Sequence, residues 1–329
     1  YKMVLRDAAT DIATLPQRAA ISELDSHSVA FVGSFALLTS GGFHWPLMTW
    51  GVGGAVVFHQ QRHPHLALQQ RAFTHCFATP STLAHLLQAP AELPLYQPAM
   101  RLLVTGGALP RVLAQAARQR LTPRVFTVFA STEAQTVAVT PFDEASEIQW
   151  HQIHPARRVQ VVDEAGQPLP AGESGLVRVR LLDALEGYLH DAEASAEFFR
   201  DGYFYPGDLG VLAANGRLAL HGRATDVINA LGSKIATGPI EQKLQNQLGV
   251  QAGCLFSVEE AGGEEIHLVI ETTRPLDQAS FAAALQPVLG PLFVRFHCHA
   301  HPQFPRNHMG KVQRLLLQRQ ILGRAEKPS

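Results

Sequence analysis

In the first half of the chain, short apolar runs alternate with segments in which apolar residues recur every three or four positions. The predicted strands are 75–79, 101–105 and 124–129, and the predicted helices between them are 80–88 and 110–120. Strands that alternate with helices predict βαβ units and a mostly parallel sheet. Ligands of such sheets bind beyond the carboxyl ends of the strands, where this chain has small-residue turns at 105–110 and 129–133.

From about residue 148, apolar and polar residues alternate with a period of two around Gly and Pro turns, which is typical of an antiparallel sheet or a small barrel. A helix is predicted at 191–199, and Asn215-Gly216 is a strong hairpin signal. Further on, a single strand, a helix at 238–249 and two more strands predict a small α+β domain.

This pattern predicts an α/β protein of three parts. Residues 1–147 form the α/β part of a large domain, 148–224 a β-rich subdomain, and 225–329 a C-terminal α+β domain. The boundary near 222–226 is a candidate hinge.

The stretch 29–58 is long and apolar enough to be considered as a membrane span. Small and polar residues at 39–42, together with His44 and Pro46, interrupt it. We therefore interpret it as a buried helix, a turn, a second helix and a strand at 55–58, and expect no membrane span.

Composition narrows the class of protein. With 46% hydrophobic and 17% charged residues the chain is typical of a globular protein, and a net charge of −1 gives no field that favours nucleic acid. The three cysteines Cys76, Cys254 and Cys298 are far apart and odd in number, which predicts no disulfide framework and suits a cytoplasmic protein.

Two stretches carry candidate chemistry at the predicted sheet edge. In GGALP (106–110) the glycines let the backbone approach a flat ligand closely, because they have no Cβ. In FASTE (129–133) Thr132 offers a hydroxyl and Glu133 a carboxylate, and Mg²⁺ prefers such oxygen ligands. Taken alone, GGALP is better explained as a simple strand-to-helix turn, and FASTE is explained at least as well as a turn capped by Ser131 or Thr132.

Two later stretches add a carboxylate and a lysine. In YFYPGDLG (203–210) Asp208 can accept hydrogen bonds from both hydroxyls of a ribose, although a helix-cap or hairpin role is the alternative. In PRNHMGK (305–311) Gly310 and Lys311 follow polar turn residues, and the alternative is a solvated lysine before the last helix.

Together and in this order, the four stretches, with GRATDVINALGSKI (222–235) after the third, resemble the adenylate-forming (AMP-binding) superfamily. It includes acyl- and aryl-CoA synthetases, acid–AMP ligases and peptide-synthetase adenylation domains. The resemblance covers nearly the whole chain. It implies a large α/β domain, a small β-barrel-like subdomain and a mobile C-terminal lid domain.

The resemblance implies a role for each matching residue. The implied ATP-binding residues are Gly106, Gly107, Ala108, Phe129, Ala130, Ser131, Asp208 and Arg223. Among these, Phe129 matches the aromatic ring over adenine, and Asp208 and Arg223 match the ribose contacts. Thr132 is implied to contact phosphate and Glu133 to bind Mg²⁺. The chain has Ala130 where the family usually has glycine, and Pro206 where threonine or serine is more frequent.

The same resemblance makes Asp226 the hinge residue and Lys311 the lysine that enters the active site during the first half-reaction. A desolvated cation there offsets the repulsion between the substrate carboxylate and the α-phosphate. The implied function is ATP-dependent conversion of a carboxylic acid into acyl-AMP, followed by transfer to the thiol of CoA or of a carrier protein's phosphopantetheine. Asn229 replaces the family's usual lysine and points to a different acceptor.

Residues 29–58 contain no aspartate of the kind that amino-acid adenylation domains use for the α-amine, so an acyl or aryl acid is favoured over an amino acid. Candidate pocket walls are Phe43, His44, Trp45 and Trp50, and burial in the core explains them equally well. The family's phosphate loop is absent and is expected upstream of residue 1. A non-catalytic nucleotide- or carrier-binding fragment is therefore the alternative function.

Sixteen histidines raise the alternative of a metal site. His297, His299 and His301 alternate along one predicted strand, and His59, His63 and His65 cluster earlier. Strand geometry alone explains the alternation, so a zinc site there is the less favoured interpretation.

Overall fold

The computed structural model describes residues 2–32, 35, 39–58, 64–182, 185–230, 233–260, 263–274, 281–283, 286–287, 290, 296–307 and 311–323. The chain divides into two compact units. Unit 1 contains Tyr1–Leu109, Leu113–Asp143 and Gln149–Leu220, and unit 2 contains Pro110–Val112, Glu144–Ile148 and His221–Ser329.

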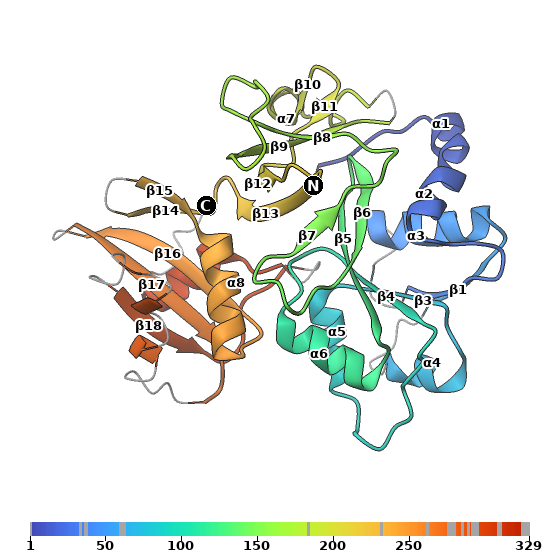
Figure 1. Ribbon diagram of the computed structural model, residues 1–329, viewed down its shortest axis with the longest axis horizontal. Coiled ribbons are helices and arrows are strands. Elements are labelled where there is room, and N and C mark those ends of the chain that lie inside the picture. The colour runs from blue at the N-terminus through green and yellow to red at the C-terminus, as the bar shows by residue number, and fades with distance from the viewer. Residues whose placement is uncertain are drawn as a thin grey trace. The chain divides into compact units, whose positions relative to one another are not determined.

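Unit 1 contains a six-stranded sheet in the order β2-β1-β3-β4-β5-β6 (Figure 1). Its strands are β1 (Val29–Phe31), β2 (Ala55–Val57), β3 (His75–Ala78), β4 (Arg101–Val104), β5 (Arg124–Ser131) and β6 (Gln135–Pro141). Only the β5–β6 pair in this order is antiparallel. The prediction of a mostly parallel sheet is confirmed.

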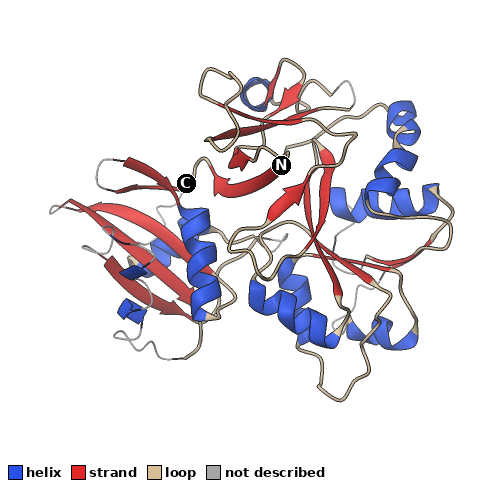
Figure 2. Cartoon of the chain, in the orientation of Figure 1, coloured by secondary structure: helices blue, strands red, loops and turns tan. Residues whose placement is uncertain are grey.

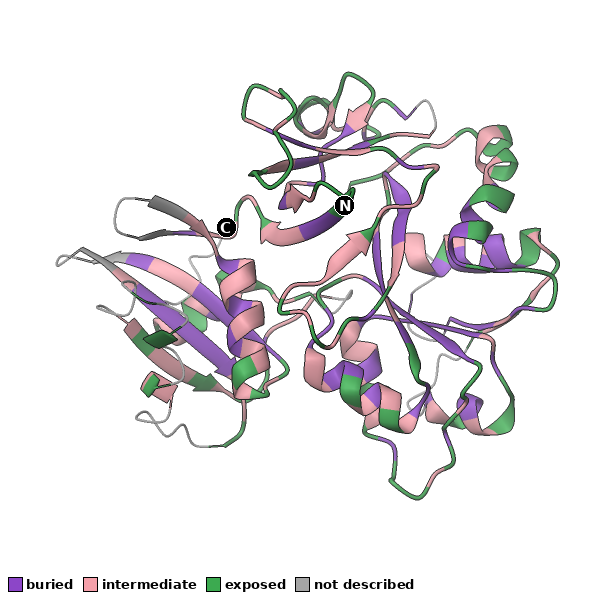
Figure 3. Cartoon of the chain, in the orientation of Figure 1, coloured by how far each residue is buried: buried purple, intermediate pink, exposed green. Residues whose placement is uncertain are grey.

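Helices cover this sheet, and its central strands are buried along their whole length (Figures 2 and 3). The helices are α1 (Ala8–Ala13), α2 (Leu15–Ile21), α3 (Ser40–Gly51), α4 (His65–Gln70), α5 (Pro80–Leu87) and α6 (Arg111–Arg120). Apolar residues of α4, α5 and α6 pack with Cys76, Leu102 and Val125 in one core cluster. On the other side Trp45 of α3 stacks on Phe77, with ring centroids 4.1 Å apart.

The stretch 29–58 differs from its prediction at one end. Residues 29–31, expected to be helical, form β1, because Val29 and Phe31 pair with β2 and the backbone of β3 holds the other edge. The second predicted helix is α3, which contains Pro46. Among the described helices, none is long and apolar enough to cross a membrane.

A second sheet, which lies in unit 1 except for residues 221–223, has seven strands, in the order β10-β11-β9-β12-β13-β7 with β8 on β9. Its elements are β7 (Trp150–Gln152), β8 (Val159–Val162), β9 (Ser174–Arg180), α7 (Ala192–Phe198), β10 (Phe199–Arg200), β11 (Tyr203–Phe204), β12 (Asp208–Leu212) and β13 (Arg217–Arg223). The described strands form an open, branched sheet and not a closed barrel, because β9 pairs with β8 on one edge and with β11 and β12 on the other.

In its described residues, unit 2 contains a hairpin, a three-stranded sheet and the helices α8 and α10. Its elements are β14 (Val227–Ala230), β15 (Ser233–Ala236), α8 (Thr237–Leu248), β16 (Gly253–Glu260), β17 (Gly263–Glu271), β18 (Phe296–His301) and α10 (Arg314–Ile321). Leu244 of α8 packs with Ile266 and Leu268 on one face of the sheet, and Leu317 of α10 packs with Val269 on the other. The single strand predicted before α8 is a two-stranded hairpin.

Candidate active site

Two turns of unit 1 follow the carboxyl ends of neighbouring parallel strands. Val104 of β4 lies opposite Thr127 of β5, so the turn at 106–108 and the turn after β5 are at the same edge of the sheet. Gly106 has φ +86, a left-handed conformation that favours glycine. The predicted adenine-binding residues Gly106, Gly107 and Ala108 therefore share an edge with the FASTE stretch, and the last two are exposed.

A β-bulge shapes the second turn. Phe129 pairs with Ala138 but Ala130 pairs with Thr136, which leaves Val137 as an extra residue in β6. Such a bulge re-aims the side chains that follow it. Phe129 itself is only 8% exposed, and its ring centroid lies 5.9 Å from that of His151.

The turn between β5 and β6 presents Thr132 and Glu133. Ser131 Oγ accepts a hydrogen bond from the N–H of Ala134 across 2.9 Å, so the capping role considered for Ser131 is present. Thr132 is exposed and Glu133 half-buried. A hydroxyl and a carboxylate thus lie together in the turn that follows β5.

The carboxylate of Glu133 is held by a residue that the sequence did not point to. Tyr188 Oη donates to Glu133 Oε1 across 2.6 Å, a length typical of a charge-assisted hydrogen bond. The backbone N–H of Tyr188 donates in turn to Ser195 Oγ on α7, 2.8 Å away. An oriented carboxylate of this kind fits the preference of Mg²⁺ for oxygen ligands, and the binding of Mg²⁺ by Glu133 stays a prediction.

Two arginines bind the backbone of the same turn. Nη2 of Arg6 donates to the carbonyl oxygens of Thr132 and Glu133, at 2.8 and 2.6 Å. Arg157 donates to the carbonyl of Ala134. Neither arginine belongs to a stretch that the sequence singled out.

These guanidiniums form part of a buried, positively charged cluster. Burial, with the added charges of Arg6 and Arg18, lowers the pKa of Arg157 to about 10. Nη1 of Arg18 lies 2.9 Å from Asp11 Oδ1, the acidic partner in the cluster. A phosphate near the turn would add the negative charge that this cluster attracts.

The candidate pocket walls do not share one environment. Trp45 is 4% exposed and belongs to the core through its stack on Phe77. Phe43 and Trp50 are 54% and 53% exposed. Burial lowers the pKa of His44 to about 4, so its ring is neutral near pH 7.

The predicted ribose contacts fall in different units. Asp208 begins β12 in unit 1 and is half-buried, whereas Arg223 ends β13 in unit 2 and is exposed. Their joint action on a ribose stays a prediction. The candidate hinge Asp226 lies in unit 2, where Thr237 donates its N–H to the Asp226 carbonyl across 3.1 Å.

Lys311 is exposed, and its backbone is hydrogen-bonded to Asn307. The N–H of Asn307 donates to the Lys311 carbonyl across 2.9 Å, and the Lys311 N–H donates to Asn307 Oδ1 across 3.0 Å. Arg306 also forms a bridge with Val312. Gly310 lies outside the described residues, as do His59 and His63. The entry of Lys311 into an active site stays a prediction.

The chain is similar to several known proteins. Residues 16–189 match the family model described as AMP-binding enzyme. A salicylyl-CoA synthase / salicylate adenylyltransferase from Streptomyces sp is 28% identical over 94% of this chain and 58% of its own length. A salicyl-AMP ligase / salicyl-S-ArCP synthetase from Mycobacterium tuberculosis is 27% identical over 87% of this chain and 54% of its own.

Among solved structures, the amide bond synthetase McbA from Marinactinospora thermotolerans has a TM-score of 0.84 at 24% identity, covering 97% of this chain and 66% of its own. This likeness shows a common fold. The chain spans little more than half the length of the two curated relatives.

Proposed function

The chain belongs to the AMP-binding enzyme family, and on that basis we propose that its protein is an AMP-forming ligase that activates a carboxylic acid with ATP. The observation that carries the proposal is the turn at 132–134. It presents a hydroxyl and a carboxylate fixed by Tyr188, beside the glycine turn at 106–108.

In the first step, a carboxylate oxygen of the acid attacks the α-phosphorus of ATP. An O–P bond forms to give acyl-AMP, and the bond to pyrophosphate breaks. Thr132 would contact phosphate, and Glu133 would hold a Mg²⁺ that neutralises phosphate charge when it is bound. Asp208 and Arg223 would bind the ribose, and Lys311 would lie between the two reacting anions.

In the second step, the sulfur of CoA or of a carrier protein's phosphopantetheine attacks the acyl carbon. The thioester forms, AMP leaves, and the thiol proton passes to solvent. Unit 2 would rotate about Asp226 between the steps and withdraw Lys311. The three free cysteines support a reducing, cytoplasmic setting for this chemistry.

We propose an acyl or aryl acid as the substrate. The names of the two relatives specify salicylate, an aryl acid, and residues 29–58 contain no aspartate that would bind an α-amine. A panel of benzoates, medium-chain fatty acids and amino acids in ATP–pyrophosphate exchange distinguishes these classes.

The decisive experiment replaces the lysine. Lys311→Ala should slow acid-dependent ATP–pyrophosphate exchange about 100- to 1000-fold, because one preorganised cation is lost. Thioester formation from supplied acyl-AMP should be retained. Lys243→Ala on α8, whose side chain is 40% exposed, is the matched control and should change neither step. Equal loss of both steps in Lys311→Ala would reject this division of labour.

A further inference from the structure

On the face of the unit 2 sheet opposite to α8, where Leu317 of α10 packs on Val269, several titratable side chains lie close together. In the parallel pair β17–β18, His267 lies opposite His297 and Val269 opposite His299. Alternate residues of a strand point to the same side, so Glu265 shares this face with the three histidines. The apolar residues between them, such as Leu268, pack toward α8 on the other face.

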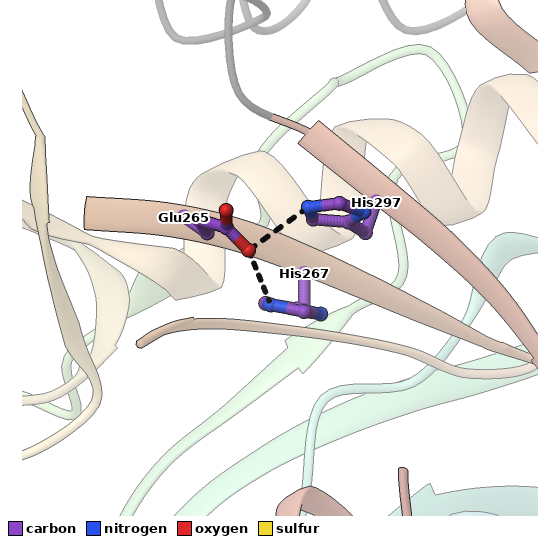
Figure 4. Close-up of side chains that lie close together, drawn as sticks. All are labelled: Glu265, His267 and His297. Atoms are coloured by element: carbon purple, nitrogen blue, oxygen red, sulfur yellow. Dashed lines mark ion pairs between the residues drawn. The ribbon is translucent and has the colours of Figure 1, made fainter. Parts of the chain in front are cut away.

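The ligand atoms converge on one point (Figure 4). Oε2 of Glu265 lies 3.1 Å from Nε2 of His297 and 4.0 Å from Nε2 of His267. The three ligand atoms all lie within 4.8 Å of one another. In a tetrahedral zinc site with bonds of about 2.0–2.1 Å, neighbouring ligand atoms are roughly 3.3 Å apart. The rings of His267 and His297 are stacked with centroids 4.7 Å apart and planes at 22°, so binding of an ion requires the more exposed His297 ring to turn its Nε2 toward Glu265 and His267.

The surroundings of His267 fix its ring. Its side chain is 7% exposed, and the ring stacks on Phe256 with centroids 5.2 Å apart and planes at 4°. Nδ1 of His267 lies 3.0 Å from Nε2 of His299. Metal-binding histidines commonly donate their second ring N–H to a carboxylate, a carbonyl or a water, which sets the tautomer and directs the other nitrogen to the ion. Here the neutral Nε2 of His299 is in position to be that acceptor.

We propose that Glu265, His267 and His297 bind a divalent transition metal such as Zn²⁺, with His299 as a positioning residue. Two imidazoles and one carboxylate form a donor set used for zinc, with water in the fourth position. Imidazole ligands also suit copper and nickel. None of the three ligands belongs to the candidate ATP site, so this proposal stands independently of the proposed ligase activity.

The bound ion would cross-link β17 and β18. These strands are adjacent in space but separated in sequence by residues 272–295. A metal that binds only the folded sheet stabilises it by mass action. The site would therefore act as a structural clamp on the domain that carries Lys311.

The alternative is a histidine stack joined to Glu265 by an ion pair, with no affinity for metal. Titration of the chelator-treated chain with Zn²⁺ in a calorimeter separates the two. The proposal predicts one equivalent bound, visible bands of tetrahedral Co²⁺ when cobalt is the probe, and a raised unfolding temperature. Absence of saturable binding would overturn it.

The variants test which residues bind. Glu265→Gln and His297→Gln remove ligands that are 33% and 47% exposed, so the fold should be retained, and each should weaken Zn²⁺ binding at least tenfold. His299→Gln should weaken it by about 10- to 100-fold while the stoichiometry stays at one. His301→Gln, on the same strand and face but opposite Glu271, is the matched control and should leave the affinity unchanged. Equal affinity in all the variants would assign the ion to other histidines and overturn the proposal.

Discussion

Arg314 and Asp226 form an ion pair in which the arginine Nε lies 2.9 Å from the aspartate Oδ2. The two terminal nitrogens of the same guanidinium each lie 2.6 Å from an oxygen of Glu241 on α8. Glu241 also accepts the Leu255 N–H across 2.7 Å. The first residue of α10 therefore ties the candidate hinge to α8 and β16, three positions after Lys311.

Arg314→Lys should destabilise unit 2. Lysine cannot reproduce the planar fork that engages both carboxylates. Breaking a buried pair costs about 3–5 kcal/mol, and the 29% exposure of Arg314 reduces our expectation to about 2 kcal/mol. Native-state hydrogen exchange of the α8 and β16 amides should show this loss. Arg319→Lys on the exposed side of α10 is the control. Equal exchange rates in both variants would mean that the contacts of Arg314 with Asp226 and Glu241 do not stabilise unit 2.

Tyr188→Phe should raise the Mg²⁺ concentration that ATP–pyrophosphate exchange requires and slow exchange about tenfold at low Mg²⁺. The variant keeps the ring but loses the 2.6 Å hydrogen bond to Glu133, and hydrogen bonds to charged groups contribute about 1.5–3 kcal/mol. Exchange rates measured across a Mg²⁺ series test this. Tyr96→Phe, at a residue 51% exposed, should behave as the wild type. An unchanged Mg²⁺ dependence in Tyr188→Phe would mean that the bond does not position Glu133.

Gly238→Ala should destabilise the start of α8. A Cβ at this position would lie 2.4 Å from the His221 carbonyl oxygen and 2.8 Å from its carbon, both backbone atoms that yield only by a main-chain shift. We expect a loss of about 1–3 kcal/mol, despite the better helix propensity of alanine. Hydrogen exchange of α8 measures it. The control is Gly253→Ala, where the added Cβ would lie 3.6 Å from the nearest atom, in a side chain. A similar loss of stability there would mean that replacing a glycine, and not the contact with His221, causes the effect.

Unit 1 should lose stability below about pH 6.5, partly through His75. Burial, with the charge of Arg101, lowers the pKa of His75 to about 4, while Nε2 contacts the Ser22 carbonyl across 3.1 Å. Between pH 6.5 and 4 the unfolded chain binds a proton that the folded chain does not, so stability falls as the pH falls. One such group contributes up to about 1.4 kcal/mol per pH unit.

His75→Gln should reduce this pH slope while preserving a donor for Ser22. All three tryptophans, Trp45, Trp50 and Trp150, lie in unit 1, so tryptophan fluorescence during urea unfolding reports on that unit. The difference in the free energy of unfolding between variant and wild type at pH 7.5, where the ring is neutral in both the folded and the unfolded state, gives the baseline. If the free energies of unfolding of variant and wild type change in parallel from pH 7.5 to 4.5, His75 is not a source of the pH dependence.

Local sequence patterns predicted the elements that are determined by their own residues. The helix α5 was predicted from Pro80 and Ser81 at its start, and β3 and β4 from continuous apolar runs. The structure adds that Thr79, which was assigned to the preceding strand, is the N-cap, because its Oγ1 accepts the Thr82 N–H. The strand β1 was missed because three apolar residues before a helix fit either structure. The pairing with β2 and β3, which decides between them, depends on residues far along the chain.

Contacts between residues distant in sequence also went unpredicted in the candidate site. The turn at 132–134 was predicted because its chemistry is contiguous in sequence. Tyr188 was missed because it lies 55 positions from Glu133, and Arg6 because it lies 126 positions from Thr132. Neither residue carries a local signal that separates it from an ordinary tyrosine or arginine. Contacts that orient a catalytic group are tertiary, and a single sequence leaves them unspecified.

The extra residue Val137 gives the β5–β6 hairpin a fixed length requirement. Because the bulge lets Thr136 and Ala138 pair with the adjacent residues Ala130 and Phe129, deleting Val137 would restore a regular ladder and remove the local bend and added twist that aim the turn at 132–134. Amino-acid replacements along the hairpin keep that aim, whereas gain or loss of one codon would change the direction in which Thr132 and Glu133 are presented. Engineering of this turn should therefore leave the hairpin length untouched.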